Sequence, residues 1–281
     1  MLDNVGSHLG EPLSLREVQL ASLEILKKVD EICQQEKLTY WLMYGTLLGA
    51  IRHRGFIPWD DDIDITMPRK DYDKLVKHFK THEEEMRPLK LLCGMEDSSV
   101  PFLITRISDT RYKMVGEYGD ALADLGVFID VYPLDGVGST VEEADEVDKA
   151  AKKTLLLYGR ANETISHLAY RHKDTSLPKY LAKKVYRALS LKSEEEYVKC
   201  LSLLAARNEY ETSDYVSCVI WEPLYRSKAW FSTTLRVPFE SIEVSIPAGY
   251  DDILKRSYGD YMQLPPEEER VGHHRYVIYK K

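Results

Sequence analysis

Residues 40–68, YWLMYGTLLGAIRHRGFIPWDDDIDITMP, contain the pattern that decides the fold of this chain. Aromatic and apolar residues over 38–43 predict a buried strand. Gly45 and Thr46 then predict a turn into a short helix, and the segment from Gly55 to Pro58 ends this helix. From Asp62 onward carboxylates alternate with isoleucines, which predicts a second strand with one buried face and one acidic face. The expected order is strand, turn, helix, strand.

The acidic cluster in this segment is the strongest indication of chemistry. Four carboxylates fall within residues 60–64, and they repel one another unless a cation or solvent neutralises them. On a strand, Asp62 and Asp64 would project from one face with Cα atoms about 6 to 7 Å apart, close enough to share divalent cations. Hard oxygen ligands favour Mg²⁺ or Mn²⁺. The alternative is a solvated acidic turn, but surface turns do not usually alternate Asp with Ile.

Two other motifs with similar spacing are disfavoured by position. An EF-hand calcium loop requires glycine at its sixth place, where this chain has Ile65. The Asp-x-Asp-x-Thr motif of haloacid-dehalogenase-type phosphatases begins at the end of an apolar strand, whereas Asp62 follows a proline, a tryptophan and two aspartates. The cluster therefore favours a Mg²⁺ or Mn²⁺ site.

Two further features extend the predicted site. Gly45 and Thr46 precede a helix N-terminus, where backbone N–H groups and the helix dipole favour phosphate. An anion-binding turn beside a carboxylate pair suits metal-assisted phosphoryl transfer. Asp130 lies alone in an apolar strand predicted over 125–132, so a metal or a basic partner should face it. The alternative for Asp130 is a salt-bridged core aspartate.

Residues 40–64 resemble the signature of the LicD family, which belongs to the nucleotidyltransferase-fold superfamily and is related to fukutin and fukutin-related protein. The resemblance extends to FIDVYPLD at 128–135 and to YGDYM at 258–262, with LPP and His273 beyond it, and so covers most of the chain. It implies an α+β fold, with a nucleotidyltransferase-like mixed β-sheet core flanked by helices and a mainly helical companion region. It also implies that Gly45 and Thr46 bind phosphate, and that the metal and the catalysis belong to Asp62, Asp64 and Asp130.

The resemblance implies transfer of a phospho-alcohol, most often phosphocholine from CDP-choline, to a sugar hydroxyl of a lipid-linked glycan such as a teichoic acid precursor or lipopolysaccharide. CMP would be released, and Asp130 is the best candidate to accept the proton of the attacking hydroxyl. Two alternatives stay open. The same site could transfer the nucleoside monophosphate itself, or the chain could be a catalytically silent protein that binds a nucleotide or glycan.

Several other residues are candidates for substrate binding. Arg52 and Arg54 could neutralise a diphosphate, although a solvated basic helix end explains them equally well. Trp59 could contribute to a cation–π site for a quaternary ammonium group. His273, with His274, could close the cleft as a phosphate or metal ligand, with a mobile tail as the alternative.

The rest of the chain predicts a division into a catalytic core (1–140), a helical region (141–212), and C-terminal strands with a tail that returns to the cleft (213–281). Helices are expected over 14–33, 69–81, most of 141–211 and 251–258. Further strands are expected over 89–93, 101–107, 216–220 and 242–246.

Composition excludes several classes of protein. The 281 residues are 44% hydrophobic and 30% charged, which is ordinary for a globular chain, and the net charge of −8 gives no sign of a nucleic-acid partner. The longest apolar stretch is too short to span a bilayer, and the N-terminus lacks the features of a secretory signal, so a cytoplasmic location is expected. The four cysteines are far apart in the sequence and are expected to be reduced and mostly buried.

One segment departs from the acidic balance. Residues 167–192 contain seven Lys or Arg against a single acid, a local net charge of +6. Apolar residues recur there at helical spacing, which predicts a basic amphipathic helix. Such a helix could rest on the anionic inner leaflet where a lipid-linked acceptor would lie, and an ordinary packed helix with a basic outer face is the alternative.

Overall fold

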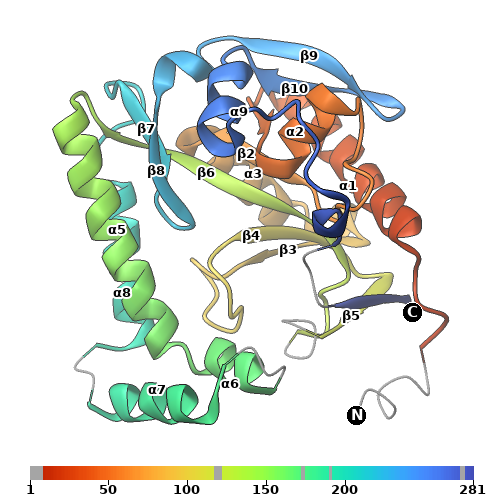
Figure 1. Ribbon diagram of the computed structural model, residues 1–281. Helices are drawn as coiled ribbons and strands as arrows, with labels where there is room; N and C mark the ends of the chain where they lie inside the picture. Colours follow the sequence, from red (N-terminus) through yellow and green to blue (C-terminus); the bar gives the residue numbers. More distant parts are fainter. Residues whose placement is uncertain (1–8, 117–121, 172–174, 190–191, 273–275) are drawn as a thin grey trace. The chain divides into compact units, whose positions relative to one another are not determined.

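The computed structural model describes residues 9–116, 122–171, 175–189, 192–272 and 276–281. It has the predicted mixed α+β fold and separates into two compact units (Figure 1). The first unit consists of Met1–Leu91, Arg106–Val131 and Trp230–Lys281, and the second of Leu92–Thr105 and Tyr132–Ala229.

The sheet of the first unit has the strand order β1-β2-β6-β4-β3 and contains the predicted site. Strand β6 continues into the second unit, where its far half pairs with β7, and β7 pairs with β8. The strands of this sheet are β1 (Trp41–Leu42), β2 (Asp64–Pro68), β3 (Leu89–Cys93), β4 (Thr105–Asp109), β6 (Val127–Gly138), β7 (Tyr215–Cys218) and β8 (Glu222–Ser227).

The prediction that Asp62 lies within a strand was wrong, because β2 begins at Asp64. The Asp60 N–H donates to the Ile57 carbonyl, which closes a turn before the strand. The first ladder bond joins the Met43 N–H to the Asp64 carbonyl at 3.0 Å. Strand β2 is buried on both faces over its first four residues, so the acidic groups that are accessible lie in the turn and not along the strand.

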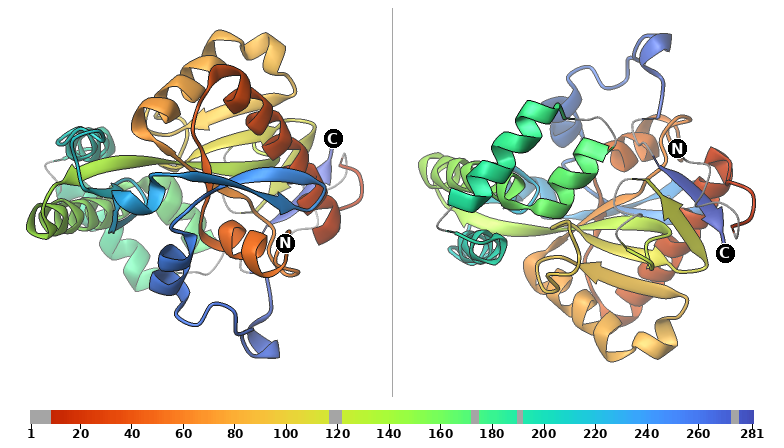
Figure 2. Two further views of the ribbon diagram at one scale, coloured as in Figure 1. Left: turned by 90° about the horizontal axis from the view of Figure 1, so that it is seen from above. Right: turned by 90° about the horizontal axis from the view of Figure 1, so that it is seen from below.

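Helices pack on both sides of this sheet. Helix α1 (Leu15–Glu36) begins with the capping box that Ser14 and Glu17 predict. The first unit also contains α2 (Tyr44–Arg52), α3 (Arg69–Thr81), α4 (Glu83–Met86) and α9 (Tyr250–Tyr258). Figure 2 shows α1 and α3 on one face of the sheet, with α2 and α9 on the other. Gly45 and Thr46 belong to the first turn of α2 and do not form a separate turn before it, which corrects the sequence prediction.

Two small antiparallel pairs complete the first unit: β9 (Thr234–Phe239) with β10 (Ile242–Pro247), and β5 (Tyr112–Val115) with β11 (Val277–Lys280). Of these strands only β10 is predicted by the sequence. Arg236 on β9 forms an ion pair with Asp30 on α1 at 2.5 Å, and Asp30 also accepts a hydrogen bond from the Tyr40 hydroxyl at 2.6 Å. This network ties the β9–β10 hairpin to α1.

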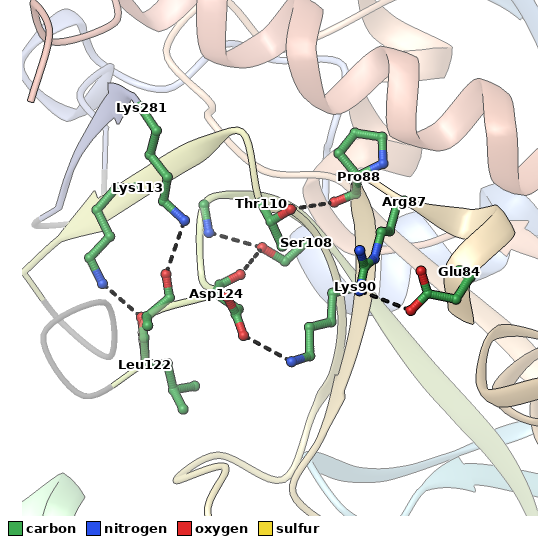
Figure 3. Close-up of polar contacts among 12 residues, drawn as sticks. Glu84, Arg87, Pro88, Lys90, Ser108, Thr110, Lys113, Leu122, Asp124 and Lys281 are labelled. Carbon is green, nitrogen blue, oxygen red and sulfur yellow. Dashed lines mark hydrogen bonds and ion pairs between the residues drawn. The ribbon is translucent and has the colours of Figure 1, made fainter. Parts of the chain in front are cut away.

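Polar side chains fix the edge of the sheet near β3 and β4 (Figure 3). Lys90 Nζ on β3 lies 2.8 Å from Asp124 Oδ2, and the Ser108 hydroxyl on β4 donates to the Asp124 carbonyl at 2.8 Å. Both side chains of the Lys90–Asp124 pair are more than 40% exposed, so solvent screens this interaction.

The second unit contains the helical region that the sequence predicts. Its helices are α5 (Val141–Ala161), α6 (Glu163–Arg171), α7 (Leu177–Leu189) and α8 (Glu194–Ala205). Figure 1 shows α5 and α8 side by side, with α6 and α7 at one end of them. Residues 172–174, between α6 and α7, lie outside the described residues.

The four cysteines are free, and three of them are buried, as predicted. Within the ranges that the structure describes, none of the helices is both long and apolar enough to cross a bilayer.

Candidate active site

Three carboxylates meet in the turn that precedes β2. Asp60, Asp61 and Asp62 are half-buried, and each offers an oxygen atom that lies within 4.8 Å of the others. We name these three residues the acidic cluster. Carboxylates at this separation repel one another, and a bound cation removes that cost. The all-oxygen, hard donor set fits Mg²⁺ or Mn²⁺.

Helix α2 approaches the acidic cluster because residue 45 is glycine. A Cβ atom at this position would lie 2.7 Å from Asp60 Oδ2, so a larger residue would displace the carboxylate. Met43, which precedes the helix, makes no side-chain capping hydrogen bond. Tyr44 has a φ of 51°, an uncommon conformation for a non-glycine residue. The N–H groups of the first turn of a helix are suited to bind an anion. A candidate cation site and a helix end suited to bind an anion therefore adjoin one another.

Thr46 and Asp64 link α2 to β2. The Asp64 N–H donates to Thr46 Oγ1 at 2.8 Å, and both residues are buried. This bond fixes the end of the turn that carries the acidic cluster. Among the described residues, the group of three carboxylates that lie within 4.8 Å of one another contains Asp62 but does not contain Asp64. Asp62 is the member of this group that was also predicted as a metal ligand from the sequence, and the roles of Asp64 and Asp130 stay predictions.

Asp130, the third predicted ligand, faces a basic residue. Arg106 Nε on β4 donates to Asp130 Oδ1 on β6 at 2.9 Å, and the two side chains are 8% and 6% exposed. The Arg106 guanidinium also lies 4.1 Å from the centroid of the Phe128 ring, within the range of a cation–π interaction. A basic partner was one of the two expectations for this isolated aspartate, and the geometry provides it.

Tyr276 is a site residue that the sequence did not indicate. It lies next to β11, its ring centroid is 6.2 Å from that of Phe128, and its hydroxyl group interacts with Asp61. Burial raises the pKa of Tyr276 well above its usual value, and the negative charges of Asp61 and Asp62 raise it further. The hydroxyl therefore stays protonated and can donate to the acidic cluster. The only signal in the sequence is the position of Tyr276 three residues after His273.

The two basic candidates at the end of α2 both take part in hydrogen bonds with main-chain groups. Arg52 Nη1 donates to the carbonyls of Tyr261 and Gln263 at 2.9 and 3.3 Å, which anchors the segment after α9. Arg54 is exposed, has a φ of 57°, and accepts the Glu240 N–H at its carbonyl. His273 lies outside the described residues.

Trp59, which directly precedes the acidic cluster, has the side chains of His53 and Arg270 near its ring. Its ring centroid is 6.3 Å from that of His53 in an edge-on arrangement, and the Arg270 guanidinium lies 5.9 Å from it. Burial, and then the charge of Arg52, lower the pKa of His53, so this imidazole is neutral at pH 7.

A pocket of about 880 Å³ opens beside Trp59. Its walls combine aromatic rings, acidic side chains and the prolines of the C-terminal segment. The lining includes Arg52, Trp59, Tyr258, Asp260, Tyr261, Pro265, Pro266, Glu268 and Glu269. Ligand sites commonly have such walls, with mostly apolar surface and a few convergent polar groups.

Two comparisons with known proteins identify the family of this chain. A model of the LicD/FKTN/FKRP nucleotidyltransferase domain matches residues 37–108, which include α2, the acidic cluster and β2. The chain is 30% identical over 270 residues to the lipopolysaccharide cholinephosphotransferase LicD of Haemophilus influenzae, covering 93% of this chain and 96% of that relative. The chain belongs to the LicD family. Its membership identifies it as a transferase.

Other relatives match shorter parts of the chain. An uncharacterised protein of Rickettsia typhi is 28% identical over 149 residues, which is 47% of this chain and 48% of that protein. An uncharacterised protein of Rickettsia prowazekii is 42% identical over 52 residues, which is 18% of this chain and 20% of that protein.

Proposed function

We propose that this LicD-family transferase moves phosphocholine from CDP-choline to a sugar hydroxyl of a lipid-linked surface glycan and releases CMP. The observation that carries the proposal is the contact between the acidic cluster and the first turn of α2 at Gly45, because it pairs a cation site with an anion site. The printed name of the H. influenzae relative, a lipopolysaccharide cholinephosphotransferase, supports phosphocholine as the transferred group.

In this reaction the sugar oxygen attacks the β-phosphorus of the donor, and the bond from that phosphorus to the bridging oxygen breaks. CMP leaves with the bridging oxygen, and the proton of the sugar hydroxyl passes to a carboxylate. A divalent cation held by Asp60, Asp61 and Asp62 would supply neutralising charge to the diphosphate. The N–H groups of the first turn of α2 bind and orient phosphate oxygens. Asp130, whose Oδ1 is held 2.9 Å from Arg106 Nε, is the carboxylate that we propose accepts this proton.

The pocket beside Trp59 supports a cationic alcohol as the transferred group. A quaternary ammonium ion is attracted to aromatic faces and to carboxylates, and the walls offer both. Because Arg270 already lies near the ring of Trp59, we assign the ammonium group to the part of the pocket near Tyr258 and Tyr261, with Asp260 as the nearest acid in the sequence.

Product analysis tests the proposal. The protein is incubated with Mg²⁺ and CDP-choline labelled in the choline or in the cytidine, with lipooligosaccharide or a lipid-linked teichoic acid precursor as acceptor. Choline label in the glycan with free CMP is the expected result. Cytidine label in the glycan would replace the proposal with nucleotidyl transfer. Binding of CDP-choline that is indifferent to Mg²⁺ or EDTA, without turnover on either acceptor, would indicate a silent binding protein.

Variants of the acidic cluster test its role in the same assay. Asp61→Asn and Asp62→Asn should each reduce turnover by about a hundredfold or more while the fold is retained, since each removes a charged ligand. Asp73→Asn, at a 60% exposed position on α3, is the matched control and should keep full activity. Full activity of Asp62→Asn would overturn the assignment.

Thermal shifts rank the donors. CDP-choline, CDP-glycerol and CDP-ribitol are each added with Mg²⁺, and the best donor should raise the melting temperature most, because a ligand at about 100 times its Kd adds about 2.7 kcal/mol of stability. A larger shift with CDP-glycerol or CDP-ribitol would contradict phosphocholine as the transferred group.

Two further expectations from the sequence stay predictions: that the bound ion is Mg²⁺ and that the protein has a cytoplasmic location.

A further inference from the structure

Helix α7 turns its apolar face to solvent. Leu177, Leu181, Val185 and Leu189 are 50%, 49%, 58% and 76% exposed. They are four residues apart, so at about 100° per residue they form a stripe about 120° wide along the whole helix. The smaller apolar residues on the same side, Pro178, Ala182 and Ala188, are exposed as well. We name this surface the α7 stripe.

The opposite face of α7 carries the polar contacts. Tyr180 is buried and its hydroxyl lies 3.5 Å from His167 Nδ1 on α6. The Tyr186 hydroxyl lies 2.8 Å from that of Tyr197 on α8. Arg187 is 15% exposed at its side chain and lies 3.9 Å from Glu163. A surface helix normally buries its apolar side. In α7 the apolar side is exposed and the polar side is packed against α6 and α8, which indicates that the α7 stripe contacts something other than water.

The charged residues of the segment that contains α7 have one sign. No acidic residue occurs between positions 175 and 193, although the chain as a whole has a net charge of −8. Lys179, Lys184 and Lys192 are exposed, and Lys183 is half-buried. Arg187 is not among these exposed cations, because its side chain is 15% exposed and its guanidinium lies 3.9 Å from Glu163. The exposed cations of this segment are therefore lysines, of which Lys184 Nζ lies 5.2 Å from the centroid of the Tyr180 ring and Lys192 Nζ lies 3.7 Å from Cys200 Sγ. Lysine stems are long enough to lie along an apolar surface while the ammonium groups reach polar headgroups.

We infer that the α7 stripe docks on an anionic lipid bilayer, with the leucines and valine at the acyl boundary and the lysines among the headgroups. A helix with a large apolar face and flanking lysines is typical of interfacial binding. A second copy of this chain fits less well, because pairing two such faces would bring like charges together. The inference stands without the proposed donor or acceptor, since lipid binding requires neither.

Vesicle co-sedimentation tests the inference on the full chain. The parent should bind vesicles of equal parts phosphatidylglycerol and phosphatidylcholine at low salt, bind less at high salt, and not sediment with pure phosphatidylcholine. Leu181→Gln with Val185→Gln should weaken binding by about tenfold or more. Its matched control is Leu20→Gln with Val141→Gln, at positions 45% and 43% exposed on other helices. This control should bind like the parent.

Charge reversal on α7 provides an independent readout. Lys179→Glu with Lys183→Glu and Lys184→Glu should abolish binding to the anionic vesicles, whereas the same three reversals at Lys74, Lys77 and Lys80 on α3 should leave most of it. Circular dichroism verifies the fold of each variant. Absence of parent binding at low salt, or equal binding by the Leu181/Val185 variant, would overturn the inference. A parent dimer that this variant dissociates would assign the stripe to a second copy and overturn it as well.

Discussion

Replacing Asp130 by asparagine should destabilise the protein far more than the same change at Asp124. Both aspartates accept a hydrogen bond from a basic side chain at nearly the same distance, 2.9 Å from Arg106 and 2.8 Å from Lys90. The side chains of the first pair are less than 10% exposed, and those of the second pair more than 40%. The two variants therefore differ mainly in burial.

Burial sets the expected magnitudes. Removing one partner of a buried ion pair leaves an uncompensated charge and costs about 3 to 5 kcal/mol. Asparagine keeps an acceptor oxygen for Arg106, and the contact of the guanidinium with Phe128 survives, so we expect Asp130→Asn to lie near the lower limit, about 3 kcal/mol. An exposed pair contributes about 0 to 1 kcal/mol, which is the loss expected for Asp124→Asn.

Urea unfolding followed by tryptophan fluorescence measures both losses, since Trp41, Trp59 and Trp230 report on the first unit. Stability is measured without substrate, so a catalytic role of Asp130 does not affect the result. Equal losses in the two variants would refute the view that burial decides the strength of these pairs. A loss below about 1 kcal/mol for Asp130→Asn would show that Arg106 does not depend on this carboxylate.

Two glycines of α2 should respond differently to alanine. Gly45→Ala should reduce turnover by about tenfold or more, because the new Cβ would displace the Asp60 carboxylate. The free energy of unfolding should change by less than about 1 kcal/mol, because this Cβ meets only the end of the Asp60 side chain. Gly49→Ala should instead lower the free energy of unfolding in urea by about 1 to 3 kcal/mol, because its Cβ would lie 2.5 Å from a main-chain carbonyl oxygen. Equal stability of the two variants would contradict this difference. The Asp30–Arg236 pair should make the protein acid-sensitive. Burial alone would raise the pKa of Asp30, but hydrogen bonds from Arg236 and the Tyr40 hydroxyl outweigh it and leave the pKa below its usual value. The folded state therefore binds this proton less readily than the unfolded state, so the contribution is complete above about pH 4 and is lost as the pH falls through the lower, folded pKa. Asp30→Asn should be less stable at pH 7 and should show a shallower loss of the urea midpoint below pH 4; parallel pH profiles would exclude this role.

Local sequence determined the elements whose signals lie within a few residues. The Ser14–Glu17 capping box marks the start of α1, because the cap bonds join residues three apart. The three consecutive aspartates after Trp59 indicated a candidate cation site, because carboxylates that are adjacent in the sequence repel one another in any fold. Because Asp130 is surrounded by apolar residues in the sequence, we predicted that a metal ion or a basic side chain faces it. The sequence did not show which of the two it is, and the structure shows Arg106.

Tertiary structure decided which distant groups meet. Arg106 faces Asp130 because β4 pairs with β6, and the strand that follows Tyr276, β11, is held by its pairing with β5. No local pattern in the sequence specifies these pairings or the contact of Tyr276 with Asp61. The sequence likewise predicted the apolar stripe of α7 but could not show that it faces solvent. A helical periodicity records that one side is apolar, whereas the direction of that side depends on which residues the neighbouring helices contact. Here α6 and α8 contact the polar side, through His167 and Tyr197, and the apolar side is left exposed.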